Sequence, residues 1–84
     1  MFHVQIITPR GIEYESDAVH VRLPEEDGFV GVLTNHAPFI TSSPGGPVDI
    51  RLPGGEETRV QIGSGFFEII KNKAIFLVSS FTPK

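Results

Sequence analysis

Glycine and proline recur so evenly along this chain that they leave no room for a long helix. The 84 residues contain nine Gly and seven Pro. Within a helix each Gly costs about 1 kcal/mol and each Pro about 3 kcal/mol relative to Ala. The segments between them alternate apolar and polar residues with a period of two, which is typical of half-buried strands. The chain is therefore predicted to fold from short strands.

The first half of the chain shows this alternation from its first residues. Phe2, Val4 and Ile6 fall in one phase, with His3 and Gln5 in the other. A type I turn is expected at 8–11. It is followed by an alternating strand in which Ile12 and Tyr14 oppose Glu13 and Glu15, and by another in which Val19, Val21 and Leu23 oppose His20 and Arg22.

The middle of the chain is expected to hold two strands separated by loops. An acidic exposed loop is predicted at 24–28, a nearly continuous apolar strand at 29–33, a corner at 34–38, a short strand at 39–41 and a Pro/Gly loop at 42–47. An apolar strand of this kind is predicted to be covered on both sides or pressed against a partner.

The second half contains the clearest hairpin. Its inward residues are predicted to be Val48, Ile50, Leu52, Thr58, Val60 and Ile62. The chain turns at 53–55, and the glycines at 63–65 break the strand where a sandwich would pass from one sheet to the other. A last hairpin is expected from 66–70 to 74–79 across 71–73. These elements predict one all-β domain over residues 1–84, an antiparallel β-sandwich of about ten short strands.

Composition restricts the function classes. The net charge of −3 and the scattered Lys and Arg disfavour nucleic acid and anionic lipid. The sequence opens on an alternating strand rather than a leader, and no apolar run approaches the ~20 residues that span a membrane, so no direct membrane insertion is expected. No Cys is present to form a disulfide. A chain this short buries only roughly 60% of its unfolded surface, so a partner is expected to add stability.

No constellation of residues predicts a reactive centre or a cofactor. The three histidines, His3, His20 and His36, stand in separate segments, which disfavours a metal site. Ser64 lies between glycines but lacks the helix of a nucleophile elbow. The Pro/Gly loops lack the helix N-terminus and nearby cation of a phosphate cradle, and the acidic loop lacks the spaced oxygen ligands of a calcium site. Neither catalysis nor a cofactor is expected.

Exposed apolar side chains remain as the candidate functional feature. Phe66 and Phe67 are adjacent on a predicted strand, so one of them must point away from the core. Phe29, Val30, Val32 and Leu33 follow the acidic loop and include further candidates. Aromatic anchors with polar surroundings favour a protein interface, and ordinary core packing is the alternative for each residue.

Several segments in order resemble one known family. Residues 28–41 read GFVGVLTNHAPFIT, which is similar to that family's spaced glycine pair followed by His-Ala-Pro. The Pro-Gly of 44–45 with Val-Asp-Ile at 48–50, the SGFFEI of 64–69 and the opening FHVQIITP also match. The chain resembles the N-terminal β-sandwich domain of the epsilon subunit of the F-type proton-translocating ATP synthase.

This resemblance implies a non-catalytic rotor subunit that couples c-ring rotation to the gamma shaft during proton-driven ATP synthesis. Carried over by position, Thr8, His36 and Thr41 match residues near gamma. Residues near the c-ring are matched by Glu26, Asp27, Gly28 and Phe29. Gly28, Gly31 and Pro38 match positions expected to shape loops.

The resemblance also implies a peripheral location, at the cytoplasmic face of an energy-transducing membrane such as the bacterial inner membrane. Most bacterial members continue into a C-terminal helical hairpin, and this sequence stops at Lys84, just after the last predicted strand. No nucleotide is expected without that hairpin. A free-standing sandwich module for a peptide or carbohydrate is the alternative function. It would need a concave groove lined by exposed aromatic residues.

Overall fold

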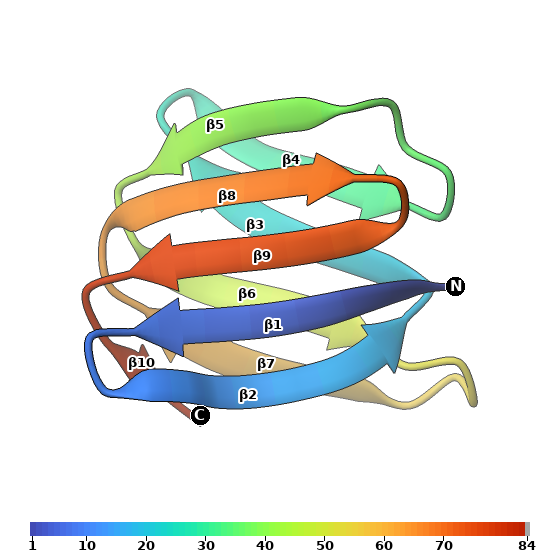
Figure 1. The fold of residues 1–84 in the computed structure, drawn as a ribbon, viewed down its shortest axis with the longest axis horizontal. Helices are drawn as coiled ribbons and strands as arrows, with labels where there is room; N and C mark the ends of the chain where they lie inside the picture. The colour runs from blue at the N-terminus through green and yellow to red at the C-terminus, as the bar shows by residue number, and fades with distance from the viewer. Residues whose placement is uncertain (84) are drawn as a thin grey trace.

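The computed structural model describes residues 1–83 and arranges them as ten strands in two sheets (Figure 1). The first sheet contains, in spatial order, β2 (Gly11–Ala18), β1 (Phe2–Thr8), β9 (Lys73–Val78), β8 (Gly65–Ile70) and β5 (Phe39–Ser43). The second contains β10 (Phe81–Thr82), β7 (Glu57–Ile62), β6 (Gly46–Arg51), β3 (His20–Glu25) and β4 (Gly28–Leu33). Nowhere in residues 1–83 is there a helix that could span a membrane.

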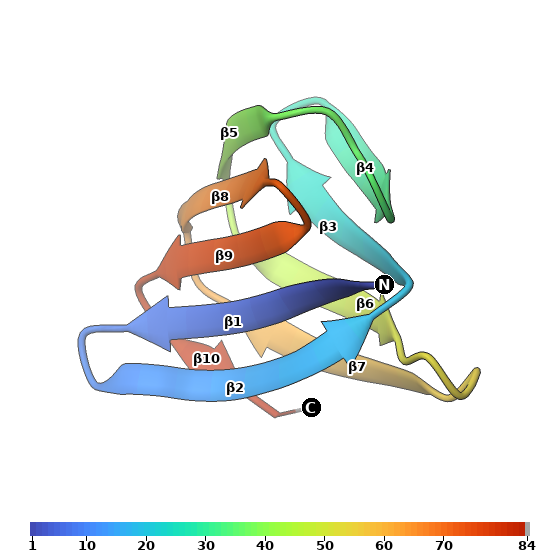
Figure 2. The same ribbon diagram turned by 45° about the vertical axis from the view of Figure 1, so that its right-hand side comes forward.

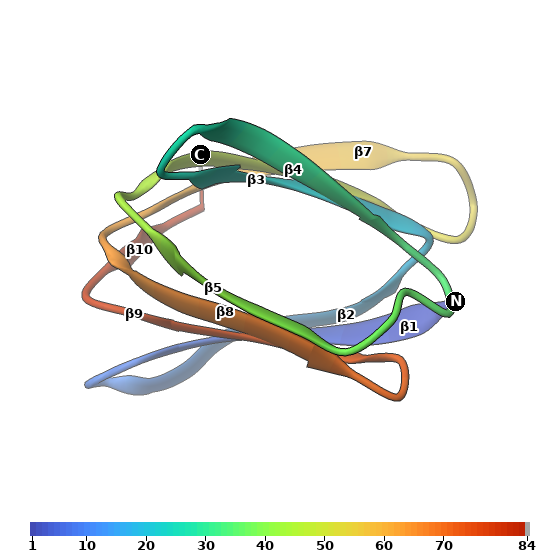
Figure 3. The ribbon, with the colours of Figure 1, turned by 90° about the horizontal axis from the view of Figure 1, so that it is seen from above.

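The two sheets face each other as the layers of a sandwich (Figure 3). The predicted all-β sandwich of about ten short strands is therefore confirmed. One pairing differs from the antiparallel prediction, because β1 and β9 run parallel. The tight β8–β9 hairpin fixes the direction of β9, and that direction is also the direction of β1. The remaining strand pairs among the described residues are antiparallel.

The core between the sheets is built from cross-strand rows of side chains. One row crosses the whole first sheet through Tyr14, Ile6, Phe76, Phe67 and Thr41, each in register with the next. Its three central members are fully buried, and the two Phe ring centroids lie 4.8 Å apart. The second sheet contributes the buried residues Val21, Leu23, Val32, Val48, Ile50, Val60 and Ile62. The inward phases predicted for β1, β3, β6 and β7 are thus confirmed.

A β-bulge in β2 makes one predicted phase wrong. Ile6 pairs with Tyr14 but the next residue, Ile7, pairs with Ile12, so Glu13 is the extra residue. The bulge places Ile12 and Tyr14 on opposite faces of the sheet rather than on the same face. Tyr14 packs against the core, and Ile12 is exposed on the outer face.

Two loops are shorter than predicted because prolines lie inside strands. The acidic loop is reduced to Glu26 and Asp27, since β3 continues through Pro24 to Glu25. The Pro/Gly loop is likewise reduced to 44–45, because β5 extends to Ser43 and β6 starts at Gly46. Proline has no backbone N–H to donate, so it cannot lie in a strand at a point where both neighbouring strands are hydrogen-bonded to it. β3 and β6 pair only over 20–22 and 49–51, so Pro24 and Pro47 each lie where one side is unpaired.

The connections that carry the chain between layers are as predicted. The predicted break takes the chain from β7 in the second sheet to β8 in the first, and it consists of Gly63 and Ser64, because Gly65 already begins β8. The corner at 34–38 joins β4 to β5 over the side of the sandwich (Figure 2). The β8–β9 turn consists only of Lys71 and Asn72, both with positive φ, so the predicted turn residue Lys73 instead begins β9.

Candidate functional site

The outer face of the first sheet carries an apolar row. Ile12, Ile7, Leu77 and Phe66 lie in register across β2, β1, β9 and β8. Of these, Ile12, Leu77 and Phe66 are exposed by 55%, 54% and 57%. The outer face of an antiparallel sheet is ordinarily polar when it meets water. An exposed row of this kind is therefore the surface on the molecule best suited to docking.

The same face continues in apolar character toward β5. Ile40 and Ile70 are exposed there, and with Pro38, Phe39 and Glu68 they line a shallow pocket. A second shallow groove runs along the apolar row at the opposite end of the sheet, beside Thr8 and Pro9. Apolar surface thus extends from one end of the first sheet to the other.

The outer face of the second sheet is charged instead over β3, β6 and β7. Arg22, Asp49 and Arg59 lie in register on β3, β6 and β7. Arg59 donates to both Asp49 oxygens at 2.6 and 3.1 Å, and this hydrogen bonding is the main cause that lowers the pKa of the Asp49 carboxyl. Arg51 pairs with Glu57 in the neighbouring row. Exposed ion pairs add little stability, and here they keep this face solvated.

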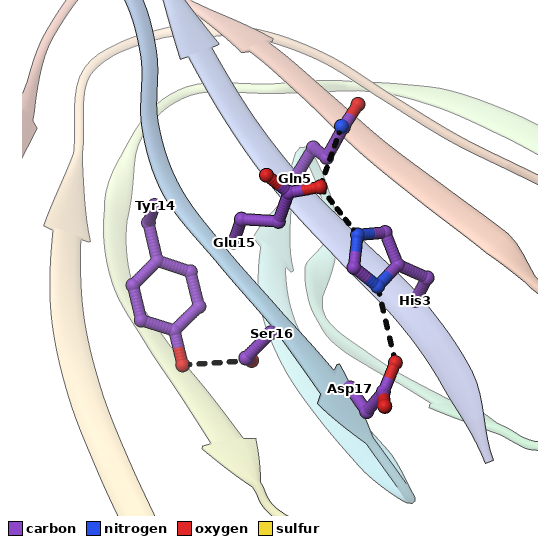
Figure 4. Close-up of polar contacts among 6 residues, drawn as sticks. All are labelled: His3, Gln5, Tyr14, Glu15, Ser16 and Asp17. Carbon is purple, nitrogen blue, oxygen red and sulfur yellow. Dashed lines mark hydrogen bonds and ion pairs between the residues drawn. The ribbon is translucent and has the colours of Figure 1, made fainter.

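A histidine between two carboxylates ties β1 to the edge strand β2 (Figure 4). His3 Nε2 lies 2.6 Å from Glu15 Oε2, and His3 Nδ1 lies 3.1 Å from Asp17 Oδ1. Gln5 also donates to Glu15 Oε2, at 2.9 Å. Both ring nitrogens can donate only when the imidazole is protonated. The hydrogen bond to Glu15, followed by that to Asp17, therefore raises the pKa of His3. No group of three or more His, Asp or Glu side chains in residues 1–83 is arranged so that it could hold a metal ion.

We expect Glu15→Gln to lower the pKa of His3 toward its ordinary value of 6.5. The raised pKa means that the His3 contact stabilises the fold fully below pH 6.5 and is lost as pH rises through the raised value. The pKa of Glu15 is lowered from its ordinary value of 4.5. The stability that the Glu15 carboxylate contributes is therefore present above pH 4.5 and is lost as pH falls through its lowered pKa. An NMR titration of the His3 ring measures the shift.

The matched control is Glu57→Gln, which removes an exposed carboxylate that pairs with Arg51 on the other sheet. It should leave the His3 titration unchanged. Equal titration curves for His3 in the wild-type and Glu15→Gln proteins would show that the contact does not govern the imidazole.

The residues matched to gamma do not come together at one point. Thr8 is buried at the end of β1, where its hydroxyl donates to Glu13 and accepts from the Arg10 amide. His36 lies in the corner at 34–38, at the opposite end of the sheet. Thr41 is in register with buried Phe67 and so shares the inner face. The three positions therefore lie around the rim of the first sheet.

The corner that carries His36 is fixed by a pair of asparagines. The Asn35 amide donates to Asn72 Oδ1 at 2.7 Å, and Asn72 Nδ2 donates to Asn35 Oδ1 at 2.9 Å. His36 Nδ1 donates to the Ala37 carbonyl at 2.7 Å, and its ring meets the edge of Phe39. These contacts tie the corner to the β8–β9 turn and order it before any partner binds.

The residues matched to the c-ring do form one continuous site. Glu26 and Asp27 make the exposed β3–β4 turn, and Gly28, with φ of 137°, starts β4 in a conformation that favours glycine. Phe29 follows and is 47% exposed on the outer face. Gly31 lies inside β4, where the His20 ring occupies the space beside it.

Comparison with known protein families identifies the family to which the chain belongs. The family model described as "ATP synthase, Delta/Epsilon chain, beta-sandwich domain" matches residues 1–84. The chain belongs to this family. The resemblance drawn from the sequence motifs is therefore confirmed.

Relatives of this ATP synthase domain come from several bacteria. The chain is 40% identical over 76 residues to the ATP synthase epsilon chain of Campylobacter fetus, covering 90% of this chain and 59% of the relative. It is 32% identical over 80 residues to that of a Nitratiruptor species, covering 95% and 62%. It is 34% identical over 76 residues to that of Chlorobium limicola, covering 90% and 86%. The chain thus spans about three fifths of the length of the first two.

Solved ATP synthase structures contain the same fold. A chain in the Euglena gracilis mitochondrial ATP synthase, solved with OSCP, F1 and the c-ring, aligns with a TM-score of 0.84 at 15% identity, over 95% of this chain and 51% of that one. A chain in the central stalk and c-ring of the Tetrahymena thermophila mitochondrial enzyme aligns with a TM-score of 0.77 at 14% identity, over 94% and 63%. At these identities the likeness establishes the fold.

Most of the apolar row of this epsilon-type domain is not predictable from alternation along single strands, which predicts only that either Phe66 or Phe67 points outward. Phe66 is the one that does. Ile7 and Leu77 escape that prediction, because they stand in the phase of β1 and β9 that should be polar. The signal that could have revealed the exposed Leu77 is the continuous apolar run at 74–78, AIFLV, which places apolar residues on both faces of β9.

Proposed function

We propose that this domain is a non-catalytic subunit of the ATP synthase rotor, coupling rotation of the c-ring to the gamma shaft. Its family and its epsilon-chain relatives support this assignment. The solved complexes that contain its fold include the central stalk and c-ring. In this role the domain is peripheral, at the cytoplasmic face of a membrane such as the bacterial inner membrane.

The observation that carries the proposal is the difference between the two outer faces. The apolar row and its extension toward Ile40 and Ile70 would be buried against the gamma subunit. Burial of such surface contributes roughly 25 cal/mol per Å². The charged row on β3, β6 and β7 of the second sheet needs no such cover. Thr8, His36 and Thr41, at the rim of the first sheet, would border the gamma contact.

The c-ring contact is assigned to the β3–β4 turn and the start of β4. Glu26 and Asp27 present carboxylates there, and Gly28 and Phe29 present backbone and an aromatic ring. This mixture suits the polar loops of a c-ring better than it suits lipid. The turn belongs to the second sheet and the apolar row to the first, so the two contacts lie on different layers.

A rotor joint of this kind must transmit torque without slipping, and it needs stiffness rather than a reactive group. Cross-strand hydrogen bonds hold each sheet, and the buried row through Phe67 and Phe76 holds the sheets together. A free-standing peptide or carbohydrate module is less well supported. The exposed aromatic residues Phe29 and Phe66 lie on different sheets and do not line one groove.

Leu77→Asp tests the gamma assignment, because it places a carboxylate in the middle of the apolar row. We expect binding to purified gamma subunit, measured by titration calorimetry, to weaken by more than about tenfold, since burying an unpaired charge in an interface core is costly. Leu33→Asp is the control. Leu33 is exposed by 60% against 54% for Leu77, but it lies on β4 of the second sheet.

Retained binding by Leu33→Asp together with loss by Leu77→Asp supports the proposed docking face. Equal affinities of both variants for gamma would contradict it. Far-ultraviolet circular dichroism and thermal melting show whether each variant is folded, as expected for substitutions at exposed positions.

A further inference from the structure

A row of interacting side chains crosses the outer face of the second sheet and ends at Phe29. Arg59, Asp49 and Arg22 lie opposite one another on β7, β6 and β3. The fourth position in the row is Gly31 on β4, opposite Arg22. Phe29 is two residues before Gly31 on the same face, which makes it the diagonal neighbour of Arg22.

The guanidinium of Arg22 lies over the ring of Phe29, with Cζ 3.9 Å from the ring centroid. This is a cation–π contact with the stacked geometry that arginine favours. Gly31 contributes no side chain opposite Arg22, and the His20 ring occupies the space beside it. The contact covers one face of a ring that is 47% exposed.

Arg22 is itself held from the other side. Its Nη1 lies 3.7 Å from Asp49 Oδ2, and both oxygens of Asp49 accept hydrogen bonds from Arg59. Asp49 is ionised at neutral pH, as an ordinary carboxyl is, and the hydrogen bonds from Arg59 lower its pKa further. Asp49 is also the least exposed of the three, with 27% of its side chain accessible. The carboxylate therefore anchors the guanidinium above the ring.

We propose that Arg22 is a positioning residue for the c-ring contact, fixing the orientation of the Phe29 ring before docking. This inference rests on the proposed function, which assigns Phe29 to that contact. Ordering a side chain on binding costs free energy equivalent to about two- to tenfold in affinity. A ring already ordered by Arg22 avoids that loss. Asp49 supports this positioning through its ion pair with Arg22, and Arg59 supports it through its hydrogen bonds to Asp49.

The test is a double-mutant cycle on binding to the detergent-purified c-ring of the source organism. The 84-residue chain is compared as wild type, Arg22→Gln, Phe29→Ala and the double variant. Gln keeps much of the side-chain stem and removes the guanidinium. We expect Arg22→Gln to weaken binding about two- to tenfold. The double variant should bind no more weakly than Phe29→Ala, because Arg22 acts through the ring.

Arg51→Gln is the matched control for charge. Arg51 lies on the same outer face with 52% side-chain exposure against 46% for Arg22, and it pairs with Glu57 rather than with an aromatic ring. It should bind the c-ring within about twofold of wild type, the scale expected of an exposed pair. NMR of the isolated variants supplies a second readout, because Arg22→Gln should average the Phe29 χ1 coupling constants and Arg51→Gln should not.

The outcomes separate this inference from the function on which it rests. Weaker binding by Phe29→Ala with equal effects of Arg22→Gln and Arg51→Gln would overturn the positioning role and leave the c-ring contact standing. Additive losses in the double variant would overturn it in the same way. Unchanged binding by Phe29→Ala would overturn both the contact and the positioning role.

Discussion

Phe67→Ala is expected to destabilise the sandwich by about 3–5 kcal/mol, the usual cost of truncating a buried Phe. Phe67 is fully buried and packs on Phe76 at the centre of the row that crosses the first sheet. A chain of this length has a total stability of only about 4–13 kcal/mol. The melting temperature, measured by calorimetry or circular dichroism, should therefore fall by at least about 12 °C.

Phe66→Ala provides the control from the neighbouring position. Phe66 is 57% exposed on the outer face, so its truncation leaves no cavity. Its effect on stability should be within about 0.5 kcal/mol, although we expect it to bind gamma more weakly. Two variants with the same melting temperature would contradict the assignment of Phe67 to the core and Phe66 to the surface.

Gly65→Ala is the second change with a large expected effect, at least about 3 kcal/mol. A Cβ at this position would lie 2.0 Å from the Leu77 carbonyl oxygen and 2.7 Å from Val78 Cα. Both neighbours are backbone atoms of the paired strand β9, so they cannot move aside without separating the ladder. Denaturant unfolding should show a much lower midpoint.

Gly54→Ala tests whether the effect belongs to this close approach. A Cβ at Gly54 would meet only the Glu56 carboxylate, at 2.9 Å, and the end of that flexible side chain can move away. The backbone of Gly54 is outside the positive-φ region. Alanine there should change stability by less than about 1 kcal/mol, with the lower entropy of the unfolded chain acting in its favour. Similar losses at both glycines would refute the steric account.

The buried and exposed rows of the first sheet are consistent with the coupling role proposed for so small a domain. Phe76 and Leu77 are consecutive, as are Phe66 and Phe67, so the same strands supply both the core and the docking surface. Any partner bound to the outer row lies one sheet away from the core. Force applied to that row in the proposed role would pass into the buried row through Ile6, Phe76 and Phe67.

Much of the fold could be predicted because the signals are local. Alternation along β1, β6 and β7 reports burial of one face, and the glycines at 63–65 and the turn at 53–55 mark where strands end. The corner at 34–38 was found for the same reason. The motif in 28–41 also identified the family, since its spacing of glycines with His-Ala-Pro is distinctive.

The rest depends on which strands become neighbours, and alternation along one strand cannot determine that. The parallel pairing of β1 with β9 joins segments about seventy residues apart. The bulge at Glu13, which turns Ile12 outward, depends on the register with β1. Pro24 is predicted to lie in the acidic exposed loop, but it lies in β3, and the side of β3 left unpaired there is defined only once β6 is in place.

The sequence by itself determined that this chain forms short strands, that the strands make a two-layered sandwich, and that it belongs with the ATP synthase epsilon chains. Periodicity, turn chemistry and a local motif contain that information. Only the tertiary structure decided that Ile12, Ile7, Leu77 and Phe66 form one exposed row, and that Arg22 covers Phe29. The physical reason is register, because a cross-strand row exists only when several separate strands align to within a single residue.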